Sequence, residues 1–165
     1  MMPAIATRSA RGAVDIDIVV GTAGWSAHAG VEDAVRRAIE AAAAFQSKAG
    51  EIAVLLTDDA TIRLMNAQWR GIDKPTNVLS FPATESDAPH LGDIAIAGET
   101  VAREAEAENK AFLDHLAHLS IHGYLHLIGF DHETDRKAER MEQLETRILA
   151  SLGIADPYAD RPGLD

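Results

Sequence analysis

Apolar and polar residues alternate along the first third of the chain with two periods, one typical of strands and one of helices. Valines and isoleucines alternate with aspartates over residues 14–20, which predicts a half-buried strand. Apolar residues then recur at helical spacing, which predicts a helix over about 31–47 that stops before Gly50. The short apolar run over 52–56 predicts a second strand.

The middle of the chain predicts a capped helix followed by two strands. Thr57 or Asp58 can cap a helix that ends at Gly71. One face of this helix carries three large apolar residues, namely Ile62, Met65 and Trp69. Strands are predicted over 78–81 and 93–97, and a polar loop separates them.

The last third of the chain predicts helices only. A helical run begins at Thr100 and is interrupted near Asn109, a helix over 112–128 carries most of the histidines, and a final helix covers 134–152. The predicted order is therefore β-α-β-α-β-β-α-α. Such an order describes an α+β domain, in which helices pack on one small mixed sheet of about four strands.

Length and composition agree with a single domain. The chain has 165 residues, of which 47% are hydrophobic, and this is enough to form a core. We expect a flexible lead over 1–12, one catalytic domain over 13–155 and a loose tail over 156–165. No apolar run is suited to a signal peptide or a membrane span, which predicts a cytoplasmic protein without membrane contact. Because cysteine is absent, any metal site must consist of histidines and carboxylates.

The charge of the chain limits its partners. A net charge of −11 argues against a general nucleic-acid binder, because such proteins are usually basic. A local basic groove is still compatible with this charge. Basic residues stand near a predicted loop only in the segment from Arg63 to Lys74.

The strongest motif is His122-Gly-Tyr-Leu-His126-Leu-Ile-Gly129-Phe-Asp-His132. Residues four apart on a helix share a face, so His122 and His126 can direct two imidazoles to one point. Gly129 can leave the helix through a left-handed turn that brings His132 back as a third ligand. Three neutral imidazoles are a zinc set whose open fourth position holds a reactive water. The motif predicts a zincin-like three-histidine metal site.

Several neighbours of the motif have more than one interpretation. His115 is more simply a polar surface residue, whereas His118 could either support a ligand or pack in the core. Asp131 could orient an imidazole, but we favour a role in starting the turn. Met141 could lie beneath the metal, but its helical spacing favours the core.

Gly123 and Arg70 bear on the kind of chemistry. A zinc protease carries glutamate after the first histidine as its general base, and this chain has Gly123 there, which we expect to leave space beside the metal. Arg70 closes the helix before the Gly-Ile-Asp-Lys-Pro loop. It could bind phosphate bidentately, or it could simply interact with the helix dipole, and position alone favours the dipole.

Four motifs in order resemble the YbeY family, the bacterial zinc-dependent endoribonucleases of rRNA maturation. They are Asn66-Ala-Gln-Trp-Arg-Gly, Lys74-Pro-Thr-Asn-Val-Leu-Ser-Phe-Pro, Leu91-Gly-Asp-Ile, and the three-histidine motif. The resemblance runs from about residue 51 to 153, and the first 50 residues match only as a strand and a helix.

The resemblance implies a hydrolase of single-stranded rRNA precursors, notably at the 3′ end of the small-subunit rRNA, and of defective ribosomes. It implies one zinc ion at His122, His126 and His132, and a catalytic role for Arg70 as well as for the three histidines. It also implies contact with small-subunit ribosomal proteins and a ribosome-assembly GTPase. Where the family usually has aspartate, this chain has Asn77, which puts any ion pair of that aspartate in doubt.

Two other functions fit parts of the pattern. A metalloprotease or another zinc hydrolase fits the ligand spacing but lacks the base at Gly123. A non-catalytic ribosome-assembly factor could use zinc structurally, although structural zinc usually has four protein ligands. In the favoured mechanism, zinc-activated water or a ribose 2′-hydroxyl attacks phosphorus while zinc and Arg70 share the developing charge.

Overall fold

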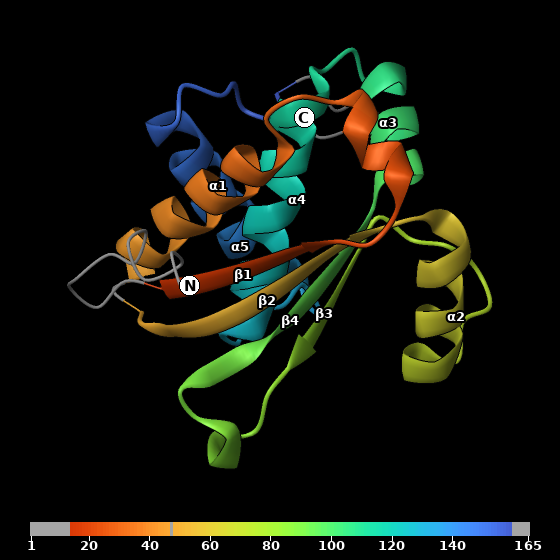
Figure 1. Cartoon of the computed structure of the whole chain (residues 1–165). Coiled ribbons are helices and arrows are strands. Elements are labelled where there is room, and N and C mark those ends of the chain that lie inside the picture. The colour runs from red at the N-terminus through yellow and green to blue at the C-terminus, as the bar shows by residue number, and fades with distance from the viewer. Residues whose placement is uncertain (1–13, 47, 160–165) are drawn as a thin grey trace, which may run out of the picture.

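The structure, a computed structural model, describes residues 14–46 and 48–159 (Figure 1). Its elements in chain order are β1 (Val14–Val20), η2 (Ala23–Ala27), α1 (Val31–Gln46), β2 (Gly50–Thr57), α2 (Asp59–Arg70), β3 (Val78–Pro82), η3 (Glu85–Asp87), β4 (His90–Ala97), α3 (Gly98–Ala107), α4 (Phe112–Leu127) and α5 (Asp135–Ser151). The predicted flexible lead over 1–12 lies outside the described residues, as do residues 160–165 of the predicted tail.

The strands of the described chain form one mixed sheet of four, in the order β1-β2-β4-β3. β1, β2 and β4 are parallel, and β3 runs antiparallel to β4 along one edge. Parallel neighbours need a long crossover, which α1 supplies between β1 and β2, whereas a loop with the short η3 turn joins β3 to β4. The predicted α+β domain with a small mixed sheet is confirmed.

Successive residues of β4 face opposite sides of the sheet, and this alternation separates two cores. Ile94 belongs to the larger core, which contains side chains of α1, α4 and α5. Ala95 belongs to the smaller core, together with Ile62 of α2. The helices α1, α4 and α5 therefore cover one face and α2 covers the other (Figure 1). β3, at the sheet edge, lies between α2 and the histidine-bearing α4.

The structure departs from the predicted element order at one place. The helical run that begins near Thr100 forms a helix of its own, α3, so three helices follow β4 rather than two. Asn109 has a φ of 56°, a left-handed conformation that an α-helix cannot contain, and the chain restarts as α4 only at Phe112. No helix in the described part of the chain has the length and apolar character needed to cross a bilayer.

Candidate metal centre

α4 and the turn after it bring the three predicted ligands together. His122 and His126 lie one turn apart on α4, and Gly129, with a φ of 105°, takes the chain back toward His132. One ring nitrogen of each histidine lies within 4.8 Å of the others. The Nε2 atoms of His122 and His126 are 3.1 Å apart, close to the roughly 3.3 Å expected for two nitrogens on a tetrahedral zinc. The donor set and its spacing therefore fit a metal ion.

The electrostatics of the cluster favour a neutral imidazole at His126. Burial, together with the nearby His122 and His132, lowers the pKa of His126 to about 4. A ring with so low a pKa is neutral at physiological pH and has a free lone pair. Metal binding through His126 therefore needs no proton to be displaced from that ring.

Glu145 of α5 is the polar residue that the sequence analysis missed. It is 0% exposed, and its Oε2 accepts a hydrogen bond of 2.5 Å from Nδ1 of His122. Its Oε1 accepts from Nε2 of His118 at 2.8 Å and from the hydroxyl of Tyr158. A carboxylate on a ligating histidine fixes the ring and its tautomer. The signal was available, because Glu145 lies four residues after Met141 and three before Ile148, on the apolar face of α5.

The charge of Glu145 decides which nitrogen of His122 is free. Burial alone would raise the pKa of this carboxyl, but the hydrogen bonds and charges of His118 and His122 outweigh it and bring the pKa to about 2. Glu145 is therefore ionised and can only accept, so Nδ1 of His122 carries the proton. The lone pair of His122 then lies on Nε2, the atom next to His126.

Replacing Glu145 by glutamine is expected to weaken zinc binding about 10- to 100-fold, because an amide cannot accept from all three donors. Zinc affinity is measured by competition with a chelator. Glu139→Gln, an exposed position on the same helix, is the control and should bind zinc as the wild type does. Equal affinities for Glu145→Gln and the control would show that the carboxylate does not orient His122.

The two histidines before the motif both have carboxylate partners. His118 contacts Glu145, so of its two interpretations the structure favours support of a ligand. His115 was predicted at the surface, and that prediction is wrong, because it is 4% exposed and its Nε2 lies 2.8 Å from Glu104. The neighbouring helix α3 covers it and supplies the carboxylate.

Asn77 contacts the same carboxylate, that of Glu104, and acts there as a hydrogen-bond donor. Its Nδ2 donates to both carboxylate oxygens of Glu104, at 3.0 and 3.3 Å, and its Oδ1 accepts from the backbone of Val78 at 2.7 Å. Burial opposes ionisation of Glu104, but the hydrogen bonds from His115 and Asn77 lower its pKa overall. The amide of Asn77 is therefore suited to the ionised Glu104, because it donates hydrogen bonds to that carboxylate.

Asn77→Asp is expected to destabilise the protein by about 1 kcal/mol at neutral pH, because two carboxylates would replace a donor–acceptor pair. Repulsion raises the pKa of such a pair above that in the unfolded chain. The loss should therefore be present at neutral pH and shrink as mildly acidic buffer protonates one carboxyl. Denaturant unfolding at both pH values tests this, with the exposed Gln143→Glu as a control of equal charge. A deficit that does not change with pH would contradict the pairing.

Gly123 does not lie beside the metal, contrary to the expectation from the sequence. Neighbouring helix positions differ by about 100°, so the residue after His122 faces elsewhere. A Cβ at Gly123 would meet Ile94, Val78 and Ser80 of the sheet at 3.1, 3.2 and 3.3 Å. Glycine here permits close packing of α4 on β3 and β4 rather than access for a substrate.

Gly123→Ala is expected to lower the free energy of unfolding by about 1 kcal/mol, because overpacking outweighs the gain in helix propensity. Ile94 and Val78 are β-branched and yield little. The exposed Gly24→Ala, whose Cβ would meet nothing within 4 Å, is the control. Zinc content should be unchanged in both variants, and unfolding curves measure the difference. A Gly123→Ala protein more stable than the wild type would contradict this packing.

The remaining predicted residues are placed as follows. Arg70 ends α2 and is exposed, and its side chain has no hydrogen bond or ion pair with any described residue. Asp131 accepts from the backbone of Glu133 at 3.0 Å, which agrees with the favoured role in the turn. Met141 is buried in the core, as its spacing predicted.

The tail over 156–165 was predicted to be loose, but its first residues are held in place. The Tyr158 hydroxyl donates to Glu145, and the side chain of Lys110 donates to the Pro157 carbonyl at 3.3 Å. These contacts close one side of a cavity of about 890 Å³ that reaches His115, His118 and His122. His115, His118 and His122 of α4 therefore border a space large enough for part of a substrate.

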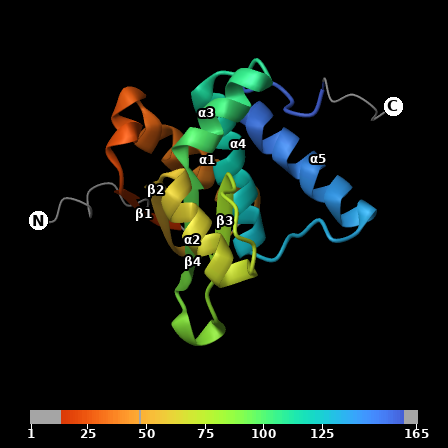
Figure 2. The same cartoon turned by 90° about the vertical axis from the view of Figure 1, so that its right-hand side faces the viewer.

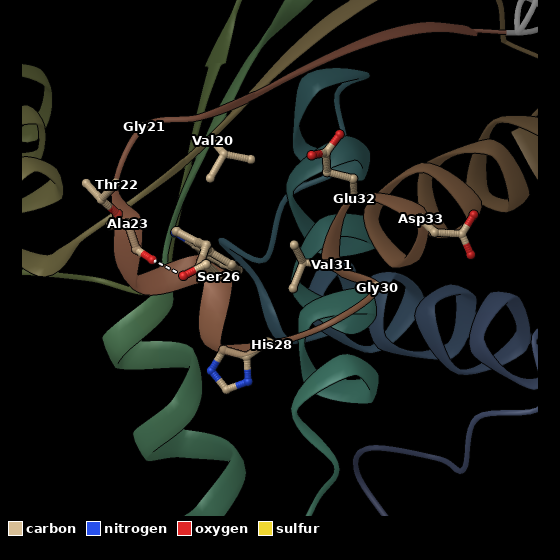
Figure 3. Close-up of a pocket in the computed structure, with 11 residues that line it drawn as sticks. Val20, Gly21, Thr22, Ala23, Ser26, His28, Gly30, Val31, Glu32 and Asp33 are labelled. Atoms are coloured by element: carbon tan, nitrogen blue, oxygen red, sulfur yellow. Dashed lines mark hydrogen bonds between the residues drawn. The ribbon is translucent and has the colours of Figure 1, made fainter.

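A second cavity, of about 650 Å³, lies between the end of β1 and the start of α1 (Figure 3). Val20, His28 and Val31 line it, and its charged groups are Glu32 and Asp33. The three clustered histidines are not part of its lining. With none of the three predicted ligands in its lining, this cavity is a poor candidate for the site of cleavage.

Comparison with known proteins points to one family. The family model described as Endoribonuclease YbeY matches residues 24–153. The chain is 56% identical over 160 residues to "Endoribonuclease YbeY" of Bradyrhizobium sp. (strain BTAi1), covering 90% of this chain and 95% of that protein. It is 59% identical over 150 residues to the protein of the same name from Bradyrhizobium diazoefficiens, covering 84% and 82%.

A solved structure has the same fold. The solution structure of TM1509 from Thermotoga maritima matches with a TM-score of 0.55 and 27% sequence identity, over 91% of this chain and 99% of that one. The family model, the relatives and the clustered histidines favour a nuclease over the protease and the structural-zinc alternatives. The chain belongs to the YbeY family and is an endoribonuclease of rRNA processing.

Proposed function

We propose that His122, His126 and His132 hold one zinc ion in a zincin-like site, and that this centre and Arg70 cleave single-stranded rRNA precursors. The observation that carries the proposal is the convergence of three ring nitrogens within 4.8 Å, with one of the rings oriented by a buried carboxylate. Zinc prefers nitrogen ligands of this kind, and three protein ligands leave a position open, as in catalytic sites. The set includes the exposed His132, which favours access from solvent.

A bound zinc ion supplies a Lewis acid that polarises a phosphoryl oxygen and makes water more acidic. The protein contributes orientation. Glu145 holds the proton of His122 on Nδ1, and burial keeps His126 neutral, so both present lone pairs. Because Glu145 already accepts from His118, His122 and Tyr158, it is not available as a general base. We therefore expect slow turnover.

Arg70 would contribute charge. Its guanidinium is exposed and has no partner among the described residues, so it is free to bind phosphate bidentately and stabilise charge that builds up on the phosphoryl oxygens. Phosphate binding would give Arg70 a part in catalysis, whereas stabilisation of the helix dipole alone would not.

The net charge of the protein bears on how the RNA substrate reaches the site. Because the protein has a net charge of −11, it should bind free RNA weakly. Small-subunit ribosomal proteins and a ribosome-assembly GTPase would therefore bring the rRNA close to it in the cytoplasm. The proposed substrate is the precursor of the small-subunit rRNA at its 3′ end, together with RNA of defective ribosomes.

Cleavage of a labelled single-stranded rRNA fragment tests the proposal. The fragment is incubated with the protein as purified, with a chelator, and with a chelator followed by excess zinc. We expect cleavage, loss of cleavage and its return. Cleavage that is unaffected by the chelator would rule out the metal mechanism, whereas a casein digest would reveal the protease alternative.

A further inference from the structure

α2 exposes two large apolar side chains, and only one of them is held in place by an aromatic ring. Leu64 is 67% exposed and Trp69 is 55% exposed. The Trp69 ring contacts the ring of Phe81 on β3, with centroids 4.9 Å apart and an interplanar angle of 65°. An edge-to-face contact of this kind fixes the indole while leaving much of its surface to solvent. Trp69 is thus a rigid, exposed aromatic surface.

The surroundings of Trp69 are locally basic despite the acidic chain. Arg63 and Asp73 neutralise each other through an ion pair of 2.8 Å. Arg70 and Lys74 are exposed, and no described residue forms a hydrogen bond or an ion pair with either of their side chains. Two uncompensated positive charges therefore follow the indole within five residues of sequence. This combination of an aromatic face with free cations is typical of sites for single-stranded nucleic acid.

One strand separates this surface from the metal centre. Phe81 faces α2, and the preceding residue, Ser80, faces α4, where its hydroxyl donates to the Gly123 carbonyl at 2.9 Å. Gly123 directly follows the ligand His122. Figure 2 looks onto this edge and shows β3 between α2 and α4. Trp69 and the histidine-bearing α4 therefore lie on opposite sides of the same edge strand, which a bound RNA would have to cross.

One acidic residue lies on the face of the sheet that carries the Trp69–Phe81 contact. Asp93 lies opposite Phe81 in the antiparallel register, on the same face of the sheet. Its Oδ1 is 3.0 Å from Nε2 of His90, so the carboxylate already has a partner. Arg70 and Lys74 are the two cations close to Trp69 in sequence that have no carboxylate partner among the described residues.

We propose that Trp69 is a stacking platform for a nucleobase of the single-stranded RNA substrate, with Arg70 and Lys74 on the adjoining phosphates. The proposal rests on the RNA-cleaving function and adds a base-binding subsite to it. Stacking is indifferent to base identity but requires an unpaired base, so the platform would select single strands over duplex.

The two tryptophans of the chain make the test direct. Trp25 is 3% exposed and donates to the Thr57 carbonyl, so a stacked base can quench only Trp69. A short single-stranded RNA should quench part of the fluorescence, and the same sequence in a duplex should not. Trp69→Phe should lose the quenching but bind within about threefold of wild type, since phenylalanine can still stack.

Affinity is measured in parallel by the anisotropy of a labelled short RNA. Trp69→Ala should bind about 5- to 100-fold more weakly, the fold-change that corresponds to the loss of one stacked base. Leu64→Ala, on the same helix and at a position even more exposed than Trp69, should bind as the wild type does. Unchanged affinity in Trp69→Ala, or quenching that is absent in the wild type, would overturn the proposal.

Two further outcomes separate this inference from others. If Trp69→Ala binds RNA normally but loses binding to isolated small ribosomal subunits, the surface is a protein-docking site and the proposal is wrong. A chelator that leaves RNA cleavage unchanged would contradict the zinc mechanism alone, because the comparison of affinities does not depend on it.

Discussion

The His126→Ala protein is expected to lose both its bound zinc and its ribonuclease activity. Elemental analysis should fall from about one zinc per chain to none, since two imidazoles cannot replace a three-histidine set. His126 is the predicted ligand whose protonation state is clearest, because a pKa of about 4 keeps its partly buried ring neutral. Its removal leaves His122 and His132 without the nitrogen that lies 3.1 Å from His122.

The matched control is His90→Ala. His90 lies at the start of β4 and contacts Asp93 rather than the cluster, so its zinc content and cleavage should equal those of the wild type. A wild-type protein that contains no transition metal, although it was never exposed to a chelator, would end this interpretation. So would a His126→Ala protein that has no zinc and still cleaves at the wild-type rate.

The fold could be predicted largely from local patterns. Period-two alternation located β1, and an aspartate cap with a terminal glycine located α2, since Asp58 accepts from the backbone of Thr61 and Gly71 is left-handed with a φ of 73°. The convergence of the three histidines was also local, because they lie within eleven residues and depend only on helix geometry and one turn. Such features are encoded by neighbours in sequence, where spacing alone is informative.

The errors concern contacts between elements distant in sequence. His115 was predicted at the surface because spacing does not reveal that α3 brings Glu104 against it. Glu145 was missed because its partner His122 is on another helix. The space attributed to Gly123 was wrong because the position faces the sheet, where an added Cβ would lie 3.1 Å from Ile94. In each case the missing information was which helix or strand lies opposite the residue.

Arg70→Ala is expected to reduce RNA cleavage about 10²- to 10³-fold, the usual cost of removing one preorganised group that stabilises transition-state charge. Zinc content should not change, because Arg70 is not a ligand. Its melting temperature should stay close to that of the wild type, since an exposed arginine at a helix C-terminus contributes at most about 1 kcal/mol through the dipole. Assays of cleavage, metal content and thermal unfolding on the same preparation measure all three.

Two further variants decide what Arg70 does. Arg70→Lys should restore little activity, because an ammonium keeps the charge but cannot form the bidentate contact of a guanidinium. Arg63→Ala removes the same charge from the same helix, but Arg63 is engaged with Asp73, so cleavage should change little. Full activity in Arg70→Lys would reduce the role of Arg70 to a diffuse charge. A large fall in the melting temperature of Arg70→Ala, with activity lost only in proportion to unfolding, would show that Arg70 stabilises the end of α2. The metal centre alone would then stabilise the charge on the phosphoryl oxygens.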